Sequence, residues 1–375
     1  MILDAAQCVC AEAFNERIEL KLADEIVGDD RGYRHSVRRY DLVNPPSHAP
    51  STVIVKQSNR GGGHIFNEWA ALALLNRIDA ISGLAPRLYG GNRELELLVL
   101  EDLGAHPKLR DELKGSDPTR AKEALVSLAG VLGRLQGATC GRFEEYNRIK
   151  SSLPSLAPID FHQRGMLFDA LAEFGSRAEV CGAAVEQGLE DDLSAVVHEL
   201  RNPGMFSSLV HGDCCPSNAT ITDRGSRLYD FEVAGFGHAL LDGAYARLRH
   251  LNCLDAYRIP REIQQSMEAA YRGALVTGCP AANDDTAFAR GMTAACAAWM
   301  AVTLRNLPRV LEEDKPRGPA SFRQRILASL DAFSGTAADF RQLDALRATA
   351  CKMLTHLRGK WAGQTVEMKL FPAFE

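Results

Sequence analysis

The sequence predicts an α+β fold with two lobes, a strand-rich N-terminal lobe over residues 1–104 and a larger helical lobe over residues 105–375. In the N-terminal part, short segments of alternating or β-branched residues are separated by turn signals, a pattern typical of a sheet. In the rest of the chain, apolar residues recur at helical spacing over long segments. A chain of 375 residues with 46% hydrophobic residues can form a large core and bind a ligand in the cleft between two lobes.

The N-terminal lobe is predicted to hold several strands and one main helix. Lys56 closes a β-branched strand, and the segment Glu101-Asp102-Leu103-Gly104 follows the last strand as a linker. The segment 67–77 combines good helix formers with helical spacing and predicts a helix that contains Glu68. The predicted strands are residues 18–22, 36–43, 52–56 and 95–100.

The helical lobe is interrupted by one β-like patch over residues 209–231. Within it, residues 219–221 and 227–229 flank a turn and are expected to pair as a hairpin. The predicted helices are residues 119–136, 166–177, 189–200, 261–276, 284–306, 324–333 and 338–357.

Composition disfavours two classes of partner. The net charge is −5 with 24% charged residues, so there is no basic excess to bind nucleic acid or an anionic membrane. The N-terminus lacks the cationic and apolar segments of a secretory signal. The apolar stretch 294–304 is shorter than the roughly 20 residues needed to cross a bilayer. We therefore expect a cytoplasmic protein, and the sequence leaves its oligomeric state open.

The ten cysteines contain no Cys-x-x-Cys pair and no cysteine and histidine set at zinc-finger spacing. The close pairs are Cys8 with Cys10 and Cys214 with Cys215, and adjacent cysteines bridge poorly. We therefore expect reduced thiols throughout, as in a cytosolic protein.

The segment from His211 to Asn218 carries the chemistry. Asp213 is followed five residues later by Asn218, which is the spacing of a kinase catalytic loop. In such a loop the aspartate receives or orients the proton of the acceptor hydroxyl, and the asparagine oxygen holds Mg²⁺. Twelve residues after Asn218, Asp230 follows a short β-run and is expected to be a second Mg²⁺ ligand, because Mg²⁺ favours oxygen ligands.

Two residues are expected to support this loop. His211 has no second ligand at metal-binding spacing, so we expect a buried histidine that hydrogen-bonds the loop backbone and holds Asp213 in place. Asp242 is expected to cap a following helix over residues 243–251 and to steady a turn at 235–237, with a third acid near the metal as the alternative.

The N-terminal lobe offers residues for a nucleotide. Lys56 ends a strand, and Glu68 lies on the next predicted helix, which is the order of the phosphate-binding ion pair of kinases. The turn over residues 27–36, which includes Ser36, is expected to cover the phosphates, with the Gly61-Gly62-Gly63 loop as a weaker candidate. The Glu101 carbonyl and the Leu103 N–H are expected to bind adenine. Because backbone groups do this, side-chain identity says little here, and the sequence does not choose between ATP and GTP.

These motifs resemble those of the aminoglycoside phosphotransferase and choline kinase family, which has a protein-kinase-like fold. The resemblance implies Asp213 as catalytic base, Asn218 and Asp230 as Mg²⁺ ligands, and Lys56 with Glu68 at the ATP phosphates. It also implies a hydroxyl acceptor on a small molecule rather than on a protein. In agreement, Gly212 replaces the arginine of the protein-kinase His-Arg-Asp motif.

The chain departs from this family at Cys214-Cys215 and at Gln136, where a histidine is common. Both positions affect the acceptor side, so an aminoglycoside-like compound, an amino alcohol, a sugar and a secondary metabolite all stay open. A cationic drug would need acidic partners, and a quaternary amine would need aromatic ones such as Trp299. The candidate acids are Asp255, Glu262, Glu268, Asp284 and Asp285.

Two other classes of function compete with a kinase. One is a catalytically inactive, kinase-like nucleotide-binding protein that acts through interactions. The other is a metal-dependent hydrolase that uses His211 and Asp213 without a nucleotide.

Overall fold

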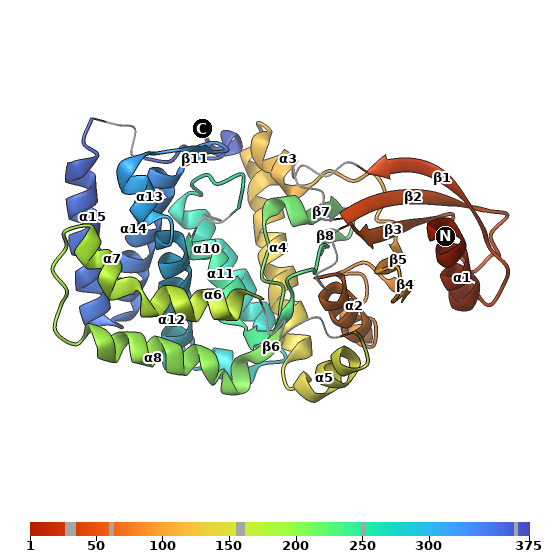
Figure 1. Ribbon diagram of the computed structural model, residues 1–375, viewed down its shortest axis with the longest axis horizontal. Helices are drawn as coiled ribbons and strands as arrows, with labels where there is room; N and C mark the ends of the chain where they lie inside the picture. Colours follow the sequence, from red (N-terminus) through yellow and green to blue (C-terminus); the bar gives the residue numbers. More distant parts are fainter. Residues whose placement is uncertain (27–34, 60–63, 155–161, 249–252, 364–366) are drawn as a thin grey trace.

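The computed structural model describes residues 1–26, 35–59, 64–154, 162–248, 253–363 and 367–375. A five-stranded antiparallel sheet with its helices lies at one end, and a larger, mostly helical lobe forms the rest (Figure 1). The strand order is β1-β2-β3-β5-β4. The bounds are β1 (Glu19–Ile26), β2 (His35–Val43), β3 (Thr52–Ser58), β4 (Leu88–Asn92) and β5 (Leu97–Glu101).

A different helix covers each face of this sheet. Helix α1 (Ile2–Phe14) packs on one face, where Val53 and Val55 of β3 are buried against it. Helix α2 (His64–Leu75) packs on the other face with Ile54. Because side chains alternate along a strand, Lys56 shares the face of Ile54 and extends toward α2.

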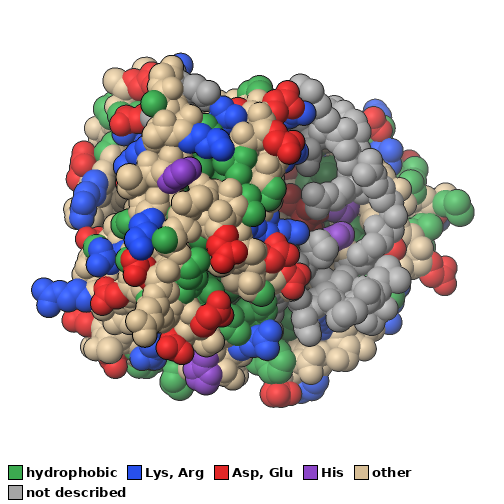
Figure 2. Space-filling model, turned by 60° about the vertical axis from the view of Figure 1, so that its left-hand side comes forward, with side chains coloured by type: hydrophobic (Ala, Val, Ile, Leu, Met, Phe, Trp, Pro, Cys, Tyr) green, Lys and Arg blue, Asp and Glu red, His purple; other side chains and the backbone are tan. Residues whose placement is uncertain are grey.

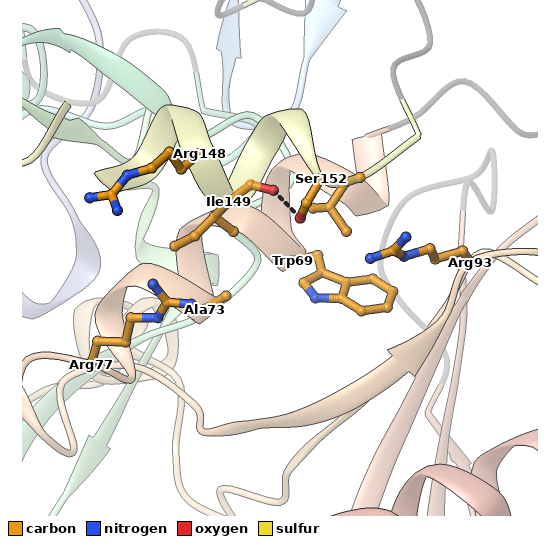
Figure 3. A pocket seen from close by; sticks show the side chains of 8 residues that line it. Trp69, Ala73, Arg77, Arg93, Arg148, Ile149 and Ser152 are labelled. Atoms are coloured by element: carbon orange, nitrogen blue, oxygen red, sulfur yellow. Dashed lines mark hydrogen bonds between the residues drawn. The ribbon is translucent and has the colours of Figure 1, made fainter. Parts of the chain in front are cut away.

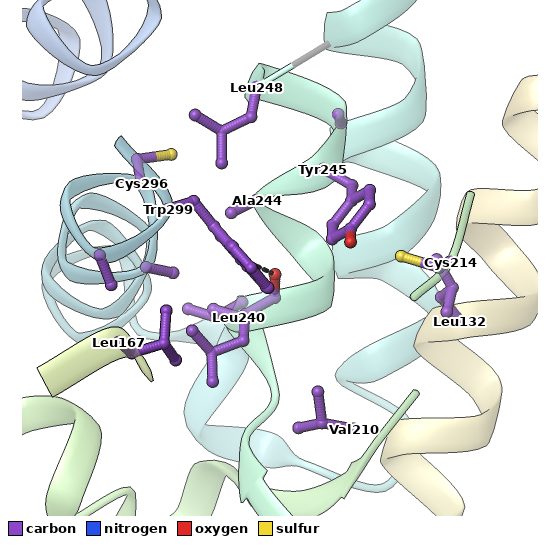
Figure 4. Packing of buried hydrophobic residues seen from close by; sticks show 14 of the residues in the cluster. Leu132, Leu167, Val210, Cys214, Leu240, Ala244, Tyr245, Leu248, Cys296 and Trp299 are labelled. Atoms are coloured by element: carbon purple, nitrogen blue, oxygen red, sulfur yellow. Dashed lines mark hydrogen bonds between the residues drawn. The ribbon is translucent and has the colours of Figure 1, made fainter. Parts of the chain in front are cut away.

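The helical lobe is built around α12, and Figure 4 shows Trp299 of this helix packed among buried side chains. Its long helices agree with the predicted ones, although α6 and α7 divide one predicted helix. The helix bounds are α3 (Leu109–Lys114), α4 (Pro118–Thr139), α5 (Phe143–Ser151), α6 (His162–Ala172), α7 (Phe174–Val180), α8 (Leu189–Arg201), α9 (Leu240–Gly243), α10 (Tyr245–Leu248), α11 (Arg261–Leu275), α12 (Asp285–Leu304), α13 (Leu307–Glu312), α14 (Phe322–Phe340) and α15 (Asp344–Lys360).

Short strand pairs lie between these helices. The predicted hairpin is confirmed, since β7 pairs antiparallel with β8. The predicted turn at residues 235–237 is wrong, because this segment is strand β9 and pairs with β6. The bounds are β6 (Ser207–Val210), β7 (Ala219–Thr222), β8 (Gly225–Leu228), β9 (Gly235–His238), β10 (Pro316–Arg317) and β11 (Ala320–Ser321).

Helices α4 and α11 approach each other closely at a glycine. A Cβ atom at Gly133 would lie 2.3 Å from the Tyr271 carbonyl oxygen, so only glycine fits here without movement of the backbone. This approach brings the Tyr271 side chain to Gln136 on the next turn of α4.

Several short elements and one helix boundary were not predicted. No element was expected in the segments that form helices α1, α3, α5 and α13 and strands β4, β10 and β11. The predicted helix over residues 338–357 is broken, because Arg341 and Leu343 adopt left-handed φ angles of 54° and 53° between α14 and α15.

Among the described residues, α12 is the one helix with the length and composition to cross a membrane. The apolar window within it is 89% buried inside the protein, as expected for the central helix of a core. On the face shown in Figure 2, acidic and basic side chains are interspersed.

Candidate active site

Lys56 joins three segments that are far apart in the chain. Its Nζ lies 2.6 Å from Glu68 Oε2 on α2 and 2.5 Å from Asp230 Oδ1, after β8. Lys56 and Glu68 are almost fully buried, at 6% and 1% exposure. The structure therefore brings together three of the residues that the sequence singled out for nucleotide and metal binding.

The charges of this cluster depend on one another. Burial alone would lower the pKa of Lys56, but the Asp230 and Glu68 carboxylates outweigh it and raise this pKa above its ordinary value. Burial would raise the pKa of Asp230, but the Lys56 ammonium holds it below its ordinary value. Lys56 is therefore protonated and Asp230 ionised at neutral pH.

The backbone at Asp230 is unusual. Its φ angle is 67°, in the left-handed region that non-glycine residues seldom adopt and that costs energy. The next residue, Phe231, is buried, and its N–H donates to Glu68 Oε1 at 3.3 Å. This conformation turns the carboxylate of Asp230 toward Lys56 while the chain enters the core.

The loop between β6 and β7 holds Asp213 next to Asn218. The Asn218 amide donates to the Asp213 carbonyl at 2.9 Å and to Asp213 Oδ2 at 3.0 Å. The short 3₁₀ helix η3 (Pro216–Asn218) makes this close approach possible. Since the amide nitrogen faces Asp213, the Asn218 Oδ1 atom is directed elsewhere and is a suitable oxygen ligand for Mg²⁺.

His211 lies behind this loop and is fully buried. Its Nε2 lies 3.1 Å from the Tyr229 carbonyl, its Nδ1 accepts the Asp213 N–H at 3.3 Å, and its ring packs on Phe231. Burial lowers the pKa of His211 to about 4, so the ring is neutral at physiological pH.

Asp242 holds the same loop from the other side. Its carboxylate accepts the backbone N–H groups of His211 at 2.7 Å and Gly212 at 3.0 Å. Gly212 has a left-handed φ of 79°, which explains glycine at this position. The predicted helix cap is wrong, because Asp242 lies inside α9 and its oxygens face the loop instead.

A second layer of polar side chains reaches Asp242 from the long helices. Gln136 of α4 donates to Asp242 Oδ2 at 2.8 Å and accepts from the Tyr271 hydroxyl at 2.5 Å. All three side chains are buried. Burial raises the pKa of Asp242 to about 6 in spite of its hydrogen bonds. Sequence reasoning noted Gln136 only as a departure and missed Tyr271, whose one signal is its place on the apolar face of α11.

The linker after β5 is fixed by its side chains. Glu101 forms an ion pair with Arg227 of β8 at 2.7 Å, and Asp102 pairs with Arg39 of β2 at 2.6 Å. The backbone contacts to adenine at Glu101 and Leu103 stay a prediction. So does the lobe boundary at residue 104.

The predicted phosphate-covering turn lies mostly outside the described residues, as does the glycine loop 60–63. Ser36 is described, and it pairs with Gln57 in the register that places Val37 opposite Lys56. Nearby, His35 Nδ1 lies 3.1 Å from Glu232 Oε2, which links β2 to the segment after Asp230.

The expectation of reduced thiols is wrong for two of the ten cysteines. Cys215 of the catalytic loop forms a disulfide with Cys253, and their Cα atoms lie 5.7 Å apart. The two residues are 38 positions apart in the sequence, so no local spacing indicated the pair. The other eight cysteines are free.

The candidate acids for a cationic acceptor have other partners. Asp255 pairs with Lys114 and Asp285 with Arg272. Glu268 pairs with Arg247, and Asp284 caps α12. Trp299 is a core residue, with its indole N–H bonded to the Leu241 carbonyl at 2.8 Å.

A separate cavity of about 280 Å³ lies between α2 and α5, as Figure 3 shows. Trp69 forms one wall, and Arg77, Arg93 and Arg148 lie around it. None of the residues that line it belongs to the cluster of Lys56, Asp213 and Asp230.

Comparisons with known proteins identify a family and several similar structures. A sequence model described as the phosphotransferase enzyme family matches residues 36–272. The structure is similar to a Plasmodium vivax ethanolamine kinase, with 11% identity, TM-score 0.45, and 86% of this chain and 83% of that chain covered.

Two further solved structures are similar over most of their length. A choline kinase from Streptococcus pneumoniae has 13% identity and TM-score 0.44, covering 84% of this chain and 94% of that one. A macrolide 2'-phosphotransferase from Brachybacterium faecium has 15% identity and TM-score 0.43, covering 82% and 94%. No curated protein matches the chain in sequence.

Proposed function

Because the chain belongs to the phosphotransferase enzyme family, we propose that it is a Mg²⁺-dependent kinase that transfers the γ-phosphoryl group of ATP to a small-molecule hydroxyl. One observation carries the proposal. Lys56, Glu68 and Asp230 meet in one ion-pair cluster, and Asn218 and Asp213 are hydrogen-bonded on a loop anchored nearby. We place the activity in the cytoplasm.

Lys56 supplies the positive charge for the nucleotide phosphates. It stays protonated in its buried position because two carboxylates surround it. Asn218 and Asp230 would hold Mg²⁺ through their side-chain oxygens, and the ion would neutralise charge on the phosphoryl group. Glu68 keeps Lys56 directed toward this place, since its second oxygen is fixed by the Phe231 N–H.

Asp213 acts on the acceptor. Its carboxylate would accept the proton of the attacking hydroxyl or orient that hydroxyl toward the phosphoryl group. Asn218 fixes one carboxylate oxygen at 3.0 Å, and His211 and Asp242 hold the backbone on either side. Catalysis would therefore come from positioning and charge neutralisation.

The described residues favour an uncharged or weakly charged acceptor over a polycation. Four of the five candidate acids are paired with basic side chains or cap a helix, and Trp299 is buried in the core. We therefore propose a sugar, amino alcohol or secondary-metabolite hydroxyl before an aminoglycoside-like polycation.

The test is a phosphoryl-transfer screen with MgATP and MgGTP over these acceptor classes. Wild type should phosphorylate at least one of them, and D213N should lose turnover by about a thousandfold while nucleotide binding is retained. The matched control is D223N, because Asp223 is exposed in the turn between β7 and β8. Near-normal activity of D213N would refute its role.

The same screen separates the competing functions. An inactive nucleotide-binding protein would bind MgATP but show neither phosphoryl transfer nor Mg²⁺-dependent ATP hydrolysis. A hydrolase would turn over a substrate without nucleotide. Either result would replace the proposed kinase.

A further inference from the structure

The disulfide between Cys215 and Cys253 lies inside the candidate active site. Cys215 stands on the catalytic loop between Asp213 and Asn218, and Cys253 belongs to the helical lobe. The carboxylate of Asp213 and the two sulfur atoms lie within 4.8 Å of one another. The covalent bond therefore ties the catalytic loop, next to Asp213, to the segment of the helical lobe that contains Cys253.

The contact with Asp213 is direct. Cys215 Sγ lies 2.9 Å from Asp213 Oδ1, while Asn218 occupies Oδ2 at 3.0 Å. A sulfur in a disulfide carries no hydrogen, so it cannot donate to this carboxylate as a thiol would. While the bond to Cys253 fixes this sulfur, it fills the space beside Oδ1 through which an acceptor hydroxyl would approach.

The partner cysteine is held firmly on its own side. Arg325 is buried and donates to the Cys253 carbonyl at 2.6 Å and to the Leu254 carbonyl at 2.9 Å. Asp255 pairs with Lys114 of α3 at 2.7 Å. These contacts do not depend on the disulfide, so the segment 253–255 should keep its place when the bond is broken.

We propose that Cys215 and Cys253 form a reversible thiol–disulfide site that controls access to Asp213, inactive when oxidised and active when reduced. The inference deepens the proposed function and rests on it for the change in activity. Disulfides in reducing compartments are mostly transient and redox-sensing, which fits a protein that uses ATP there.

The chemistry requires an external dithiol. A thiolate of the reductant attacks one of the two sulfurs, the S–S bond breaks, and a mixed disulfide forms. The second thiol of the reductant displaces the protein sulfur, so two electrons and two protons pass to Cys215 and Cys253. The reductant leaves as a disulfide. A small disulfide such as oxidised glutathione reverses the reaction.

The first experiment maps the bond in the full chain. Protein equilibrated with oxidised glutathione or with dithiothreitol is alkylated, digested without reduction and analysed by mass spectrometry. A peptide that links Cys215 to Cys253 should be present in the oxidised sample and absent in the reduced one. If no such peptide forms, or if it persists in dithiothreitol, the site is not reversible and the proposal fails.

The second experiment measures phosphoryl transfer by the two forms. Reduced wild type should be at least about tenfold faster than oxidised wild type, because the acceptor hydroxyl can then reach the Asp213 carboxylate. C253S should match reduced wild type in dithiothreitol, and in oxidised glutathione it should stop at a mixed disulfide of Cys215 with glutathione, which mass spectrometry detects. C140S is the matched control and should keep the dependence, because Cys140 and Cys279 are a neighbouring pair of free thiols elsewhere in the lobe.

The third readout does not need enzymatic activity. Labelling of carboxyl groups with a carbodiimide and an amine should modify Asp213 in the reduced form and much less in the oxidised form. Equal labelling and equal activity in both forms would overturn the proposal and indicate a structural disulfide. If labelling changes but neither form transfers phosphate to any acceptor, the redox site stands and the proposed function fails.

Discussion

Two carboxylates lie on opposite sides of the catalytic loop in contrasting surroundings. Asp230 is partly exposed and contacts the Lys56 ammonium at 2.5 Å, and its pKa lies below the ordinary value. Asp242 is fully buried and accepts from neutral donors, two backbone N–H groups, the Gln136 amide and the Cys214 thiol, and burial raises its pKa to about 6. One carboxylate has a charged partner and access to solvent, and the other has neither.

This difference fits the proposed metal ligand at Asp230 and a supporting role for Asp242. A carboxylate that must bind a metal needs its charge and an open side. A carboxylate that only fixes a loop needs hydrogen-bond donors in the right positions, and neutral donors on its two oxygens are sufficient. Substitutions at the two positions should therefore affect different properties.

The largest effect is expected at Asp230. D230N removes the carboxylate charge beside Lys56 and should lower kcat by about a thousandfold. The free energy of unfolding should change by less than about 1 kcal/mol, because Glu68 still pairs with Lys56 and the position is partly exposed. Steady-state kinetics and urea titration measure the two quantities, with D223N as control.

The opposite pattern is expected at Asp242. In D242N the amide has one oxygen for the loop N–H groups of His211 and Gly212, and one buried donor loses its acceptor. Unfolding should become easier by about 2 kcal/mol, with a smaller loss of kcat than in D230N. Equal stability of D242N and wild type in urea titration would show that the loop does not depend on this carboxylate.

The two groups that flank the loop should also give opposite pH profiles. The pKa of His211 is about 4 in the folded protein against 6.5 unfolded, so its contribution to stability is present above 6.5 and is lost as pH falls toward 4. The pKa of Asp242 is about 6 against 3.8, so its contribution is present below 3.8 and is lost as pH rises through 6. Between about pH 4 and 6 the two slopes should cancel in the wild type.

Single variants should reveal each slope separately. H211Q should lose stability as pH rises from 4 to 6, and D242N should gain it, each by up to about 1.4 kcal/mol per pH unit relative to wild type. Urea titrations at several pH values measure these slopes. Parallel profiles for the three proteins would mean that these groups titrate normally.

The smallest effect is expected at Tyr271. Y271F removes the hydroxyl that donates to Gln136 and leaves a buried oxygen of Gln136 with one contact fewer. The expected loss is about 1 kcal/mol of stability, with nucleotide affinity unchanged because Asp242 keeps both loop contacts. Y257F is a suitable control, since the Tyr257 ring packs on Phe371. A change in nucleotide affinity would mean that the network extends to the other carboxylate.

Local patterns were sufficient to single out the residues that meet in the ion-pair cluster and on the neighbouring loop. Lys56 lies near the end of strand β3, Glu68 lies in the second turn of helix α2, and Asp213, Asn218 and Asp230 follow a spacing set by one loop and one hairpin. Their separations within each motif are short, so the covalent chain limits where they can lie. The strands and most long helices were predicted for the same reason, because periodicity is a local property.

The supporting side was decided by tertiary structure. Gln136 and Asp242 are 106 residues apart, and Gln136 and Tyr271 are 135 apart, so no spacing relates them. Their contact depends on the approach of α4 and α11 at Gly133. The same holds for Cys253, which reaches Cys215 only when the helical lobe is folded. The sequence by itself determined the family motifs and the local elements, and packing decided what holds the catalytic loop and which cysteine is bonded to Cys215.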